Sequence, residues 1–151
     1  MSELKDRLQA DLTSAMRARD EVTTATLRMA LAAITTEEVA GSSARELSDG
    51  DVLKVLAREA KKRREAAEAF SSADRPELAD REQAEGAVLE RYLPAQLGDE
   101  EVADLVRATI KATGAAGMPQ MGAVMKAAQA SAAGRVDGKR LSTEVRKQLA
   151  G

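Results

Sequence analysis

The chain has 151 residues, of which 23 are basic and 25 acidic, and it contains no His, Cys or Trp. Without Cys or His there can be no thiolate nucleophile, no Ser-His-Asp triad, no disulfide and no zinc site built from the usual ligands. Any metal would need carboxylate ligands alone, which suit Mg²⁺ or Ca²⁺. We expect no metal and no cofactor. A net charge of −2 argues against a uniformly basic nucleic-acid-binding protein.

The composition is typical of a cytoplasmic, all-α protein. Thirty-one alanines accompany abundant Leu, Glu, Arg and Lys, which are strong helix formers. The absence of Cys is typical of proteins of the reducing cytoplasm. The longest apolar run, residues 29–34, is too short to cross a membrane, so we expect no membrane association.

The first two helices are predicted from their caps. Ser2 is expected to cap the first helix, in which an apolar side chain recurs every fourth residue from Leu4 to Met16. Asp20 is expected to cap the second helix, and Gly41 is expected to end it.

Two more helices are predicted before a proline ends the pattern. Ser48 opens the third helix, which is expected to run to about Phe70. Pro76 occupies a first-turn position and opens the fourth helix, which Pro94 cannot continue.

The composition changes after this proline. Residues 1–94 hold 15 basic and 19 acidic side chains, whereas residues 95–151 hold 8 basic and 6 acidic side chains and more glycine. We therefore predict an N-terminal subdomain of four helices, residues 1–94, and a small C-terminal subdomain of three helices, residues 95–151. The three short helices are expected at about 99–112, from Pro119 to Gly134, and at about 142–149.

A basic cluster on the third helix has two interpretations. Four of its cations fall on one helical face: Lys54, Arg58, Lys61 and Lys62. They could contact phosphates, most plausibly of RNA. Alternatively, they form a solvated face that is paired with the glutamates of the same helix at 59, 65 and 68.

The segment Gly134–Arg140 is the second candidate. Its two glycines expose backbone N–H groups beside three cations, which is an arrangement that can hold a phosphate. It is not a P-loop, because the glycines are too close and Arg140 stands where Ser or Thr would bind Mg²⁺. The alternative is a turn between helices in which the glycines act as C-caps.

Carboxylates on the fourth helix form the third candidate. They are Glu77, Asp80, Glu82, Glu85 and Glu90. Because no nucleophile or cofactor motif accompanies them, we expect salt bridges to the basic third helix and no catalytic residue.

These motifs resemble the YqeY family over nearly the whole chain. The resemblance rests on Leu27-Arg28, Lys61-Lys62-Arg63-Arg64-Glu65, Phe70, Glu82, Glu85, Leu89, Tyr92-Leu93-Pro94, Met121-Gly122-Ala123-Val124-Met125-Lys126, Gly134-Arg135-Val136-Asp137-Gly138-Lys139 and Val145. That family is similar to the tail domain of the GatB subunit of the aspartyl/glutamyl-tRNA amidotransferase and to a domain of some glutaminyl-tRNA synthetases. The resemblance implies an all-helical tRNA-binding accessory element. It also carries a family label of carbon–nitrogen ligase activity with glutamine as amide donor.

The leading expectation is a non-catalytic tRNA- or RNA-binding module that reads backbone and shape. The cations expected to meet phosphates are Lys126, Arg135, Lys139, Arg140, Arg146 and Lys147, with Lys61, Lys62 and Arg64 as a secondary patch. The alternative is a protein-interaction subunit that joins an amidotransferase or an aminoacyl-tRNA synthetase complex. An intrinsic ligase would need a glutaminase nucleophile and an ATP site, and the sequence shows neither motif.

Overall fold

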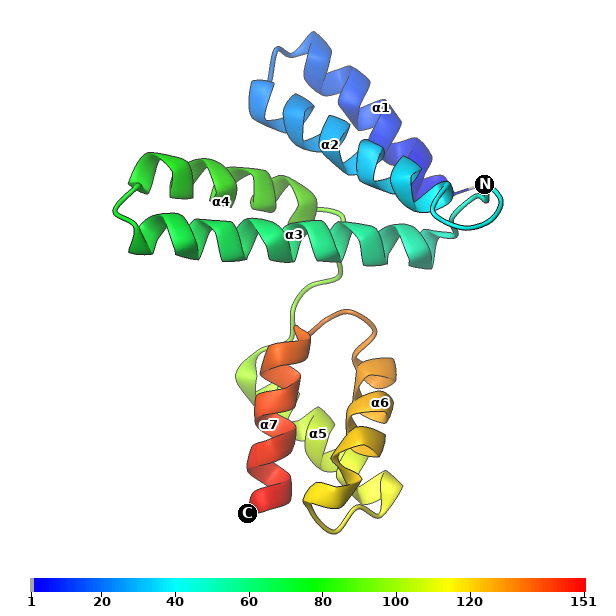
Figure 1. Ribbon diagram of the computed structural model, residues 1–151, viewed down its shortest axis with the longest axis vertical. Helices are drawn as coiled ribbons and strands as arrows, with labels where there is room; N and C mark the ends of the chain where they lie inside the picture. The colour runs from blue at the N-terminus through cyan, green and yellow to red at the C-terminus, as the bar shows by residue number, and fades with distance from the viewer. Residues whose placement is uncertain (1) are drawn as a thin grey trace. The chain divides into compact units, whose positions relative to one another are not determined.

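The computed structural model describes residues 2–151, and in this range every regular element is a helix (Figure 1). The predicted all-α class is therefore confirmed. The chain divides into two compact units, with the boundary between Leu93 and Pro94. The larger unit contains four α-helices and the smaller unit contains three, together with one 3₁₀ turn.

The larger unit is built from two helical pairs. Its helices are α1 (Glu3–Arg17), α2 (Glu21–Glu38), α3 (Asp49–Ser72) and α4 (Pro76–Glu90). The predicted N-caps are confirmed, because the side chains of Ser2, Asp20 and Ser48 each accept a backbone hydrogen bond from the residue three positions later. In Figure 1 the α1–α2 pair lies across the antiparallel α3–α4 pair.

Helix α2 ends earlier than predicted. It stops at Glu38, and Gly41 lies in the following loop without a left-handed conformation. The reason is tertiary, because the chain turns back here to bury Leu47 in the core, where it is 3% exposed. The Arg45 N–H closes the loop on the Glu38 carbonyl at 2.9 Å, a contact that the local sequence does not reveal.

Small aliphatic residues form the core of the larger unit. The members are Leu8, Leu27, Ala30, Ile34, Leu47, Val52, Val55, Leu56, Ala60, Val88 and Leu89. Met16, which the four-residue spacing placed on the buried face of α1, is 49% exposed and contacts the Arg28 guanidinium instead. Helices α3 and α4 are in close contact at Gly86, where an added Cβ would lie at an ordinary van der Waals distance of 3.5 Å from the Arg63 Cβ.

The smaller unit packs three short helices around its own core. They are α5 (Asp99–Thr113), α6 (Met121–Ala132) and α7 (Gly138–Ala150), with the 3₁₀ turn η1 (Met118–Gln120) before α6. Its buried residues are Leu97, Val102, Val106, Val124, Ala128, Leu141 and Val145. The prediction that the last helix begins at about residue 142 is wrong, because the Asp137 side chain caps the helix at the Lys139 N–H.

Candidate nucleic-acid interface

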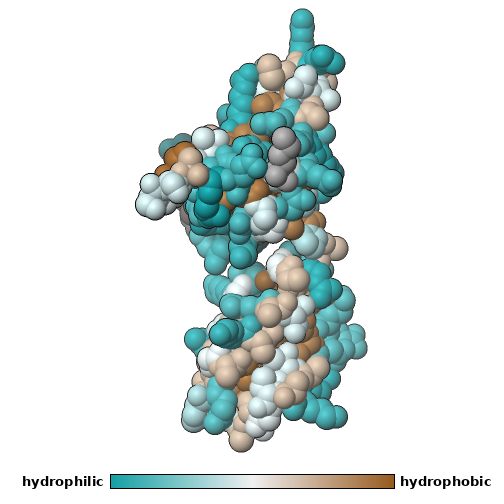
Figure 2. All heavy atoms as spheres, turned by 90° about the vertical axis from the view of Figure 1, so that its right-hand side faces the viewer, coloured by the Kyte–Doolittle hydropathy of each residue, from teal (hydrophilic) through white to brown (hydrophobic). Residues whose placement is uncertain are grey.

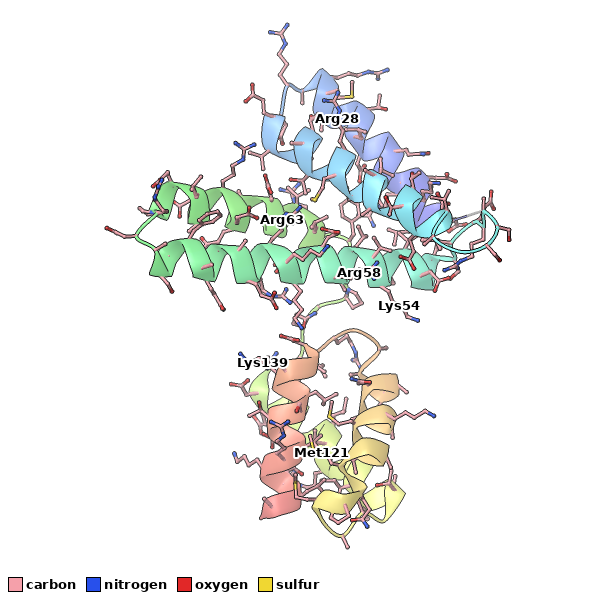
Figure 3. The ribbon with its side chains drawn as sticks, in the orientation of Figure 1. Arg28, Lys54, Arg58, Arg63, Met121 and Lys139 are labelled. Atoms are coloured by element: carbon pink, nitrogen blue, oxygen red, sulfur yellow. The ribbon has the colours of Figure 1, made fainter. Side chains whose placement is uncertain are left out.

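Three cations lie exposed on the outward side of α7. Leu141 and Val145 are almost completely buried, so the opposite side of the helix faces solvent. That side carries Lys139, Arg146 and Lys147, which we call the α7 basic face. Figure 3 shows Lys139 on the side of α7 that points away from α6. Within residues 2–151, these three side chains form no hydrogen bond or ion pair.

A hollow of about 460 Å³ adjoins this face between α5 and α7. Its lining residues are Asp99, Val102, Lys139, Arg140, Thr143, Glu144 and Lys147. The two acidic members already have partners. Asp99 pairs with Arg140 at 2.8 Å, and Glu144 accepts a hydrogen bond from the Gln148 amide at 2.8 Å. Arg140 offsets the charge of Asp99, whereas Glu144 keeps its charge, so the hollow presents its two lysines to an anion beside one uncompensated carboxylate.

Arg135 and Arg140 hold the smaller unit together. The Arg135 guanidinium donates to the carbonyls of Ala132 at 2.9 Å and Ser131 at 3.2 Å, which are at the end of α6. The Arg140 guanidinium donates to the Leu97 carbonyl at 3.0 Å, in addition to its pair with Asp99. A phosphate would have to compete with these contacts, so the two arginines are less available than the α7 basic face.

The Gly134–Arg140 segment has the geometry of a turn between helices. Ala133, the C-cap of α6, and the following Gly134 are both left-handed, with φ values of 50° and 80°, and Gly138 is the first residue of α7. The Asp137 carboxylate accepts the Lys139 N–H at 3.2 Å and so occupies the helix start where a phosphate would bind. The geometry therefore favours the connecting-turn interpretation over a backbone phosphate cradle.

Lys126 lies apart from the α7 basic face on another helix. It is exposed on α6, on the side opposite the buried residues Val124 and Ala128. Its exposed neighbours are small, including Ala123 and Ala130. Figure 2 views the side on which α6 lies in Figure 1, and there the smaller unit presents mainly white and tan residues. Lys126 is therefore a single charge in a weakly polar surface.

The predicted secondary patch on α3 is largely paired. Lys62 lies 3.4 Å from Glu59, and Arg64 lies 3.6 Å from Glu90. Arg58, which belongs to the same stripe, lies 3.4 Å from Glu37. Two of these partners come from α2 and α4, so the pairing involves the fold and not only neighbours in one helix. Lys54 is exposed and points away from the other helices of its unit (Figure 3).

A half-buried ionic cluster joins α3 to α4. The Arg63 side chain, which is only 17% exposed, lies 3.7 Å from Glu59, 3.6 Å from Glu82 and 3.3 Å from Glu85. It also contacts the Met29 sulfur on α2. The predicted salt bridges between the fourth-helix carboxylates and the third helix are confirmed. These glutamates therefore have a structural partner in Arg63.

A second cluster surrounds the only tyrosine and was missed from the sequence. The Tyr92 hydroxyl donates to the Asp11 carboxylate at 2.6 Å, and the Arg7 guanidinium lies 4.9 Å above the ring. Burial, and then the hydrogen bond to Asp11, raises the pKa of Tyr92 to about 12. The Tyr-Leu-Pro motif marked this position, but its partner lies 81 residues away in the sequence. The cluster anchors the end of α4 to α1.

The fold and the surface define a small helical protein of two units, in which three exposed cations, unpaired among residues 2–151, lie on one side of the last helix. The chain belongs to the YqeY family, because the family model described as Yqey-like protein matches residues 5–149. Within the described residues, no group of potential ligands suited to a metal ion is found. No helix in the same range has the length and apolar character needed to span a membrane.

Two similar proteins come from yeasts. An uncharacterized protein of Schizosaccharomyces pombe is 34% identical over 88 residues, which cover 58% of this chain and 69% of the relative. The protein named "Altered inheritance of mitochondria protein 41, mitochondrial", of Meyerozyma guilliermondii, is 36% identical over 86 residues. That match covers 57% of this chain and 44% of the relative.

Proposed function

We propose that this protein is a non-catalytic accessory module that binds tRNA or a similar RNA through the α7 basic face. The proposal depends on one observation, namely that three neighbouring cations are exposed and unpaired. Lys139, Arg146 and Lys147 are exposed, lie on one side of one helix, and have no partner among the residues that the structure describes. Phosphates bind such groups without breaking an existing contact.

The other candidate cations are expected to contribute less to RNA binding. Lys62 and Arg64 would have to exchange a glutamate for a phosphate, and Arg135 and Arg140 would have to leave backbone carbonyls. Lys126 can add one contact from α6. The α7 basic face is therefore the primary surface in this proposal, and Lys61, Lys62 and Arg64 remain a secondary patch.

The choice of tRNA rests on the family. The YqeY family is similar to the tail domain of the GatB subunit of a tRNA-dependent amidotransferase, in which the tail is an accessory element. The ligase label of the family would require a nucleophile and an ATP site. Here the fourth-helix glutamates Glu82 and Glu85 are instead paired with Arg63. Binding is therefore the proposed role.

The test is binding of fluorescently labelled tRNA to the full chain, measured by anisotropy. A triple variant, Lys139→Gln with Arg146→Gln and Lys147→Gln, removes the α7 basic face without touching the core. We expect at least about a tenfold loss of affinity, because three phosphate contacts disappear. Circular dichroism is expected to show unchanged helicity.

A matched control removes the same charge elsewhere. Arg17→Gln, Arg75→Gln and Lys111→Gln replace exposed cations outside the proposed surface, and their combination should keep most of the affinity. Equal losses in both triple variants would reject the α7 basic face. If wild-type protein does not bind tRNA at low salt, the RNA proposal fails, and the protein-interaction alternative is then tested by co-purification with amidotransferase or synthetase subunits.

A further inference from the structure

The smaller unit has charge for binding RNA but no ring for stacking bases. Residues 94–151 contain no Phe, Tyr or Trp. Proteins that bind single strands combine cations with aromatic side chains on which unpaired bases stack. The α7 basic face therefore offers no aromatic ring to an unpaired base, and Arg146 is its one planar group on which a base could stack.

Two polar side chains beside these cations already donate hydrogen bonds within the smaller unit. The Gln148 amide donates to the Ala103 carbonyl at 2.9 Å and to Glu144. The Thr143 hydroxyl donates to the Lys139 carbonyl at 2.9 Å. Amides and hydroxyls are among the groups that read base edges, and these two already donate inward, so they are not available to a base. What remains available on this side of the helix is positive charge.

The cations are held at fixed spacing by one continuous helix. Lys139 and Lys147 are eight residues apart, so their Cα atoms are separated by about 12 Å along the axis of α7. One phosphate cannot bridge this distance. A duplex holds its phosphates in a regular array, whereas a single strand must be ordered before it can match a rigid row of charges.

We propose that the α7 basic face binds base-paired RNA through the phosphates of a stem and discriminates against single-stranded RNA. This inference rests on the proposed RNA-binding function and specifies its substrate class. Duplex RNA is recognised mainly by shape and by contacts to phosphates and 2′-hydroxyls, which do not require aromatic side chains. A row of unpaired cations on a helix supplies the phosphate part of that recognition.

The experiment compares two labelled RNAs of equal length with the full-length protein at one salt concentration. One is a closed hairpin with a continuous stem, and the other is oligouridylate, which forms no stem. We expect the hairpin to bind at least about fivefold more tightly, because only the stem offers preordered phosphates. The triple variant of Lys139, Arg146 and Lys147 to Gln should lose this preference, and the control triple variant should keep it.

The outcomes separate this inference from the proposed function. Equal affinity for the two RNAs, or a preference for oligouridylate, overturns the duplex inference. If tRNA still binds in that case and still depends on α7, the proposed function stands. A hairpin preference that survives in the α7 triple variant also overturns the inference, because another surface would then be responsible. Failure to bind tRNA removes both proposals.

Discussion

At the scale of single residues, the ionisable groups of the larger unit serve its packing. Arg63 is surrounded by three glutamates, and the exposed cations Lys62 and Arg81 pair with two of them from outside. A half-buried charge is tolerated when its neighbours compensate it, and it is costly when one partner is removed. The cluster therefore fixes how α3 and α4 face each other.

Replacing the central arginine should destabilise the larger unit. Arg63→Met leaves Glu59, Glu82 and Glu85 close together without their shared cation, and we expect a loss of about 3 kcal/mol in the free energy of unfolding. Arg64→Met is the matched control, because the pair that Arg64 forms with Glu90 is about half exposed. The control should lose less than about 1 kcal/mol in urea unfolding followed by circular dichroism. Similar losses would contradict the assigned role of Arg63.

The pKa of Tyr92 can be measured directly by ultraviolet absorbance, because Tyr92 is the only tyrosine and no tryptophan is present. The phenolate absorbance should titrate with a pKa of about 12 instead of 10.0. Asp11→Asn should move the pKa part of the way back, because burial of the ring remains. Arg7→Gln should move it upward, because the nearby guanidinium favours the phenolate.

The same shift has a consequence for stability. A tyrosine whose pKa is raised in the folded state stabilises the fold while it is neutral, so its contribution is present below about pH 10 and is lost as the pH rises towards 12. The difference in unfolding free energy between wild-type protein and Tyr92→Phe should change against wild type across this pH range, because only wild type has a phenol to ionise. A constant difference between them would show that the folded-state pKa is not raised.

At the scale of elements, the smaller unit depends on the ends of its helices. Helix α5 ends at Gly114, which is left-handed with a φ of 70°, and α6 begins with Met121 followed by Gly122. No neighbouring atom lies within 4 Å of a Cβ added at either glycine, so only the backbone distinguishes the two positions. A left-handed site favours glycine, whereas a helical site favours alanine.

Two alanine substitutions should therefore act in opposite directions. Gly114→Ala is expected to lower the stability of the smaller unit by about 1 kcal/mol, because an L side chain strains the left-handed conformation. Gly122→Ala is expected to raise stability by up to about 1 kcal/mol, because it improves helix propensity. Thermal unfolding of the two variants checks the signs. A stabilising Gly114→Ala would mean that α5 does not end as described.

At the scale of the whole molecule, helix boundaries could be predicted where a local capping signal sets them, and not where tertiary contacts do. The caps at Ser2, Asp20 and Ser48 are chemical features of neighbouring residues, and the structure confirms them. The end of α2 was misplaced because burial of Leu47 decides where the chain turns. The start of α7 lies earlier than predicted because the Asp137 side chain caps the helix within the glycine-rich segment.

The candidate interface, too, could be predicted from the sequence only in part. The basic character of the last helix could be read from the sequence, and Lys139, Arg146 and Lys147 are exposed together. The internal contacts of Arg135 and Arg140 could not be predicted, because one caps α6 and the other reaches Leu97 and Asp99 from α7. Counting charges along a chain does not show which cations are already bound.

In the proposed RNA-binding role, the acidic and basic parts of the chain would act on RNA in opposite directions. Residues 1–94 carry a net charge of −4 and residues 95–151 a net charge of +2, so attraction must come from a local surface. A surface of three unpaired cations predicts modest affinity and a defined salt dependence. Each neutralised phosphate contributes about −0.9 to the slope of log affinity against log salt concentration.

The most direct test is this slope for tRNA and the full-length protein. For wild-type protein we predict a slope of about −3 or steeper, and for the triple variant of Lys139, Arg146 and Lys147 to Gln a slope that is shallower by about 2.7, because only Lys126 and the secondary patch remain. The control triple variant of Arg17, Arg75 and Lys111 to Gln should keep the wild-type slope. Binding that does not change with salt, or a slope unchanged by loss of the α7 basic face, would contradict the account.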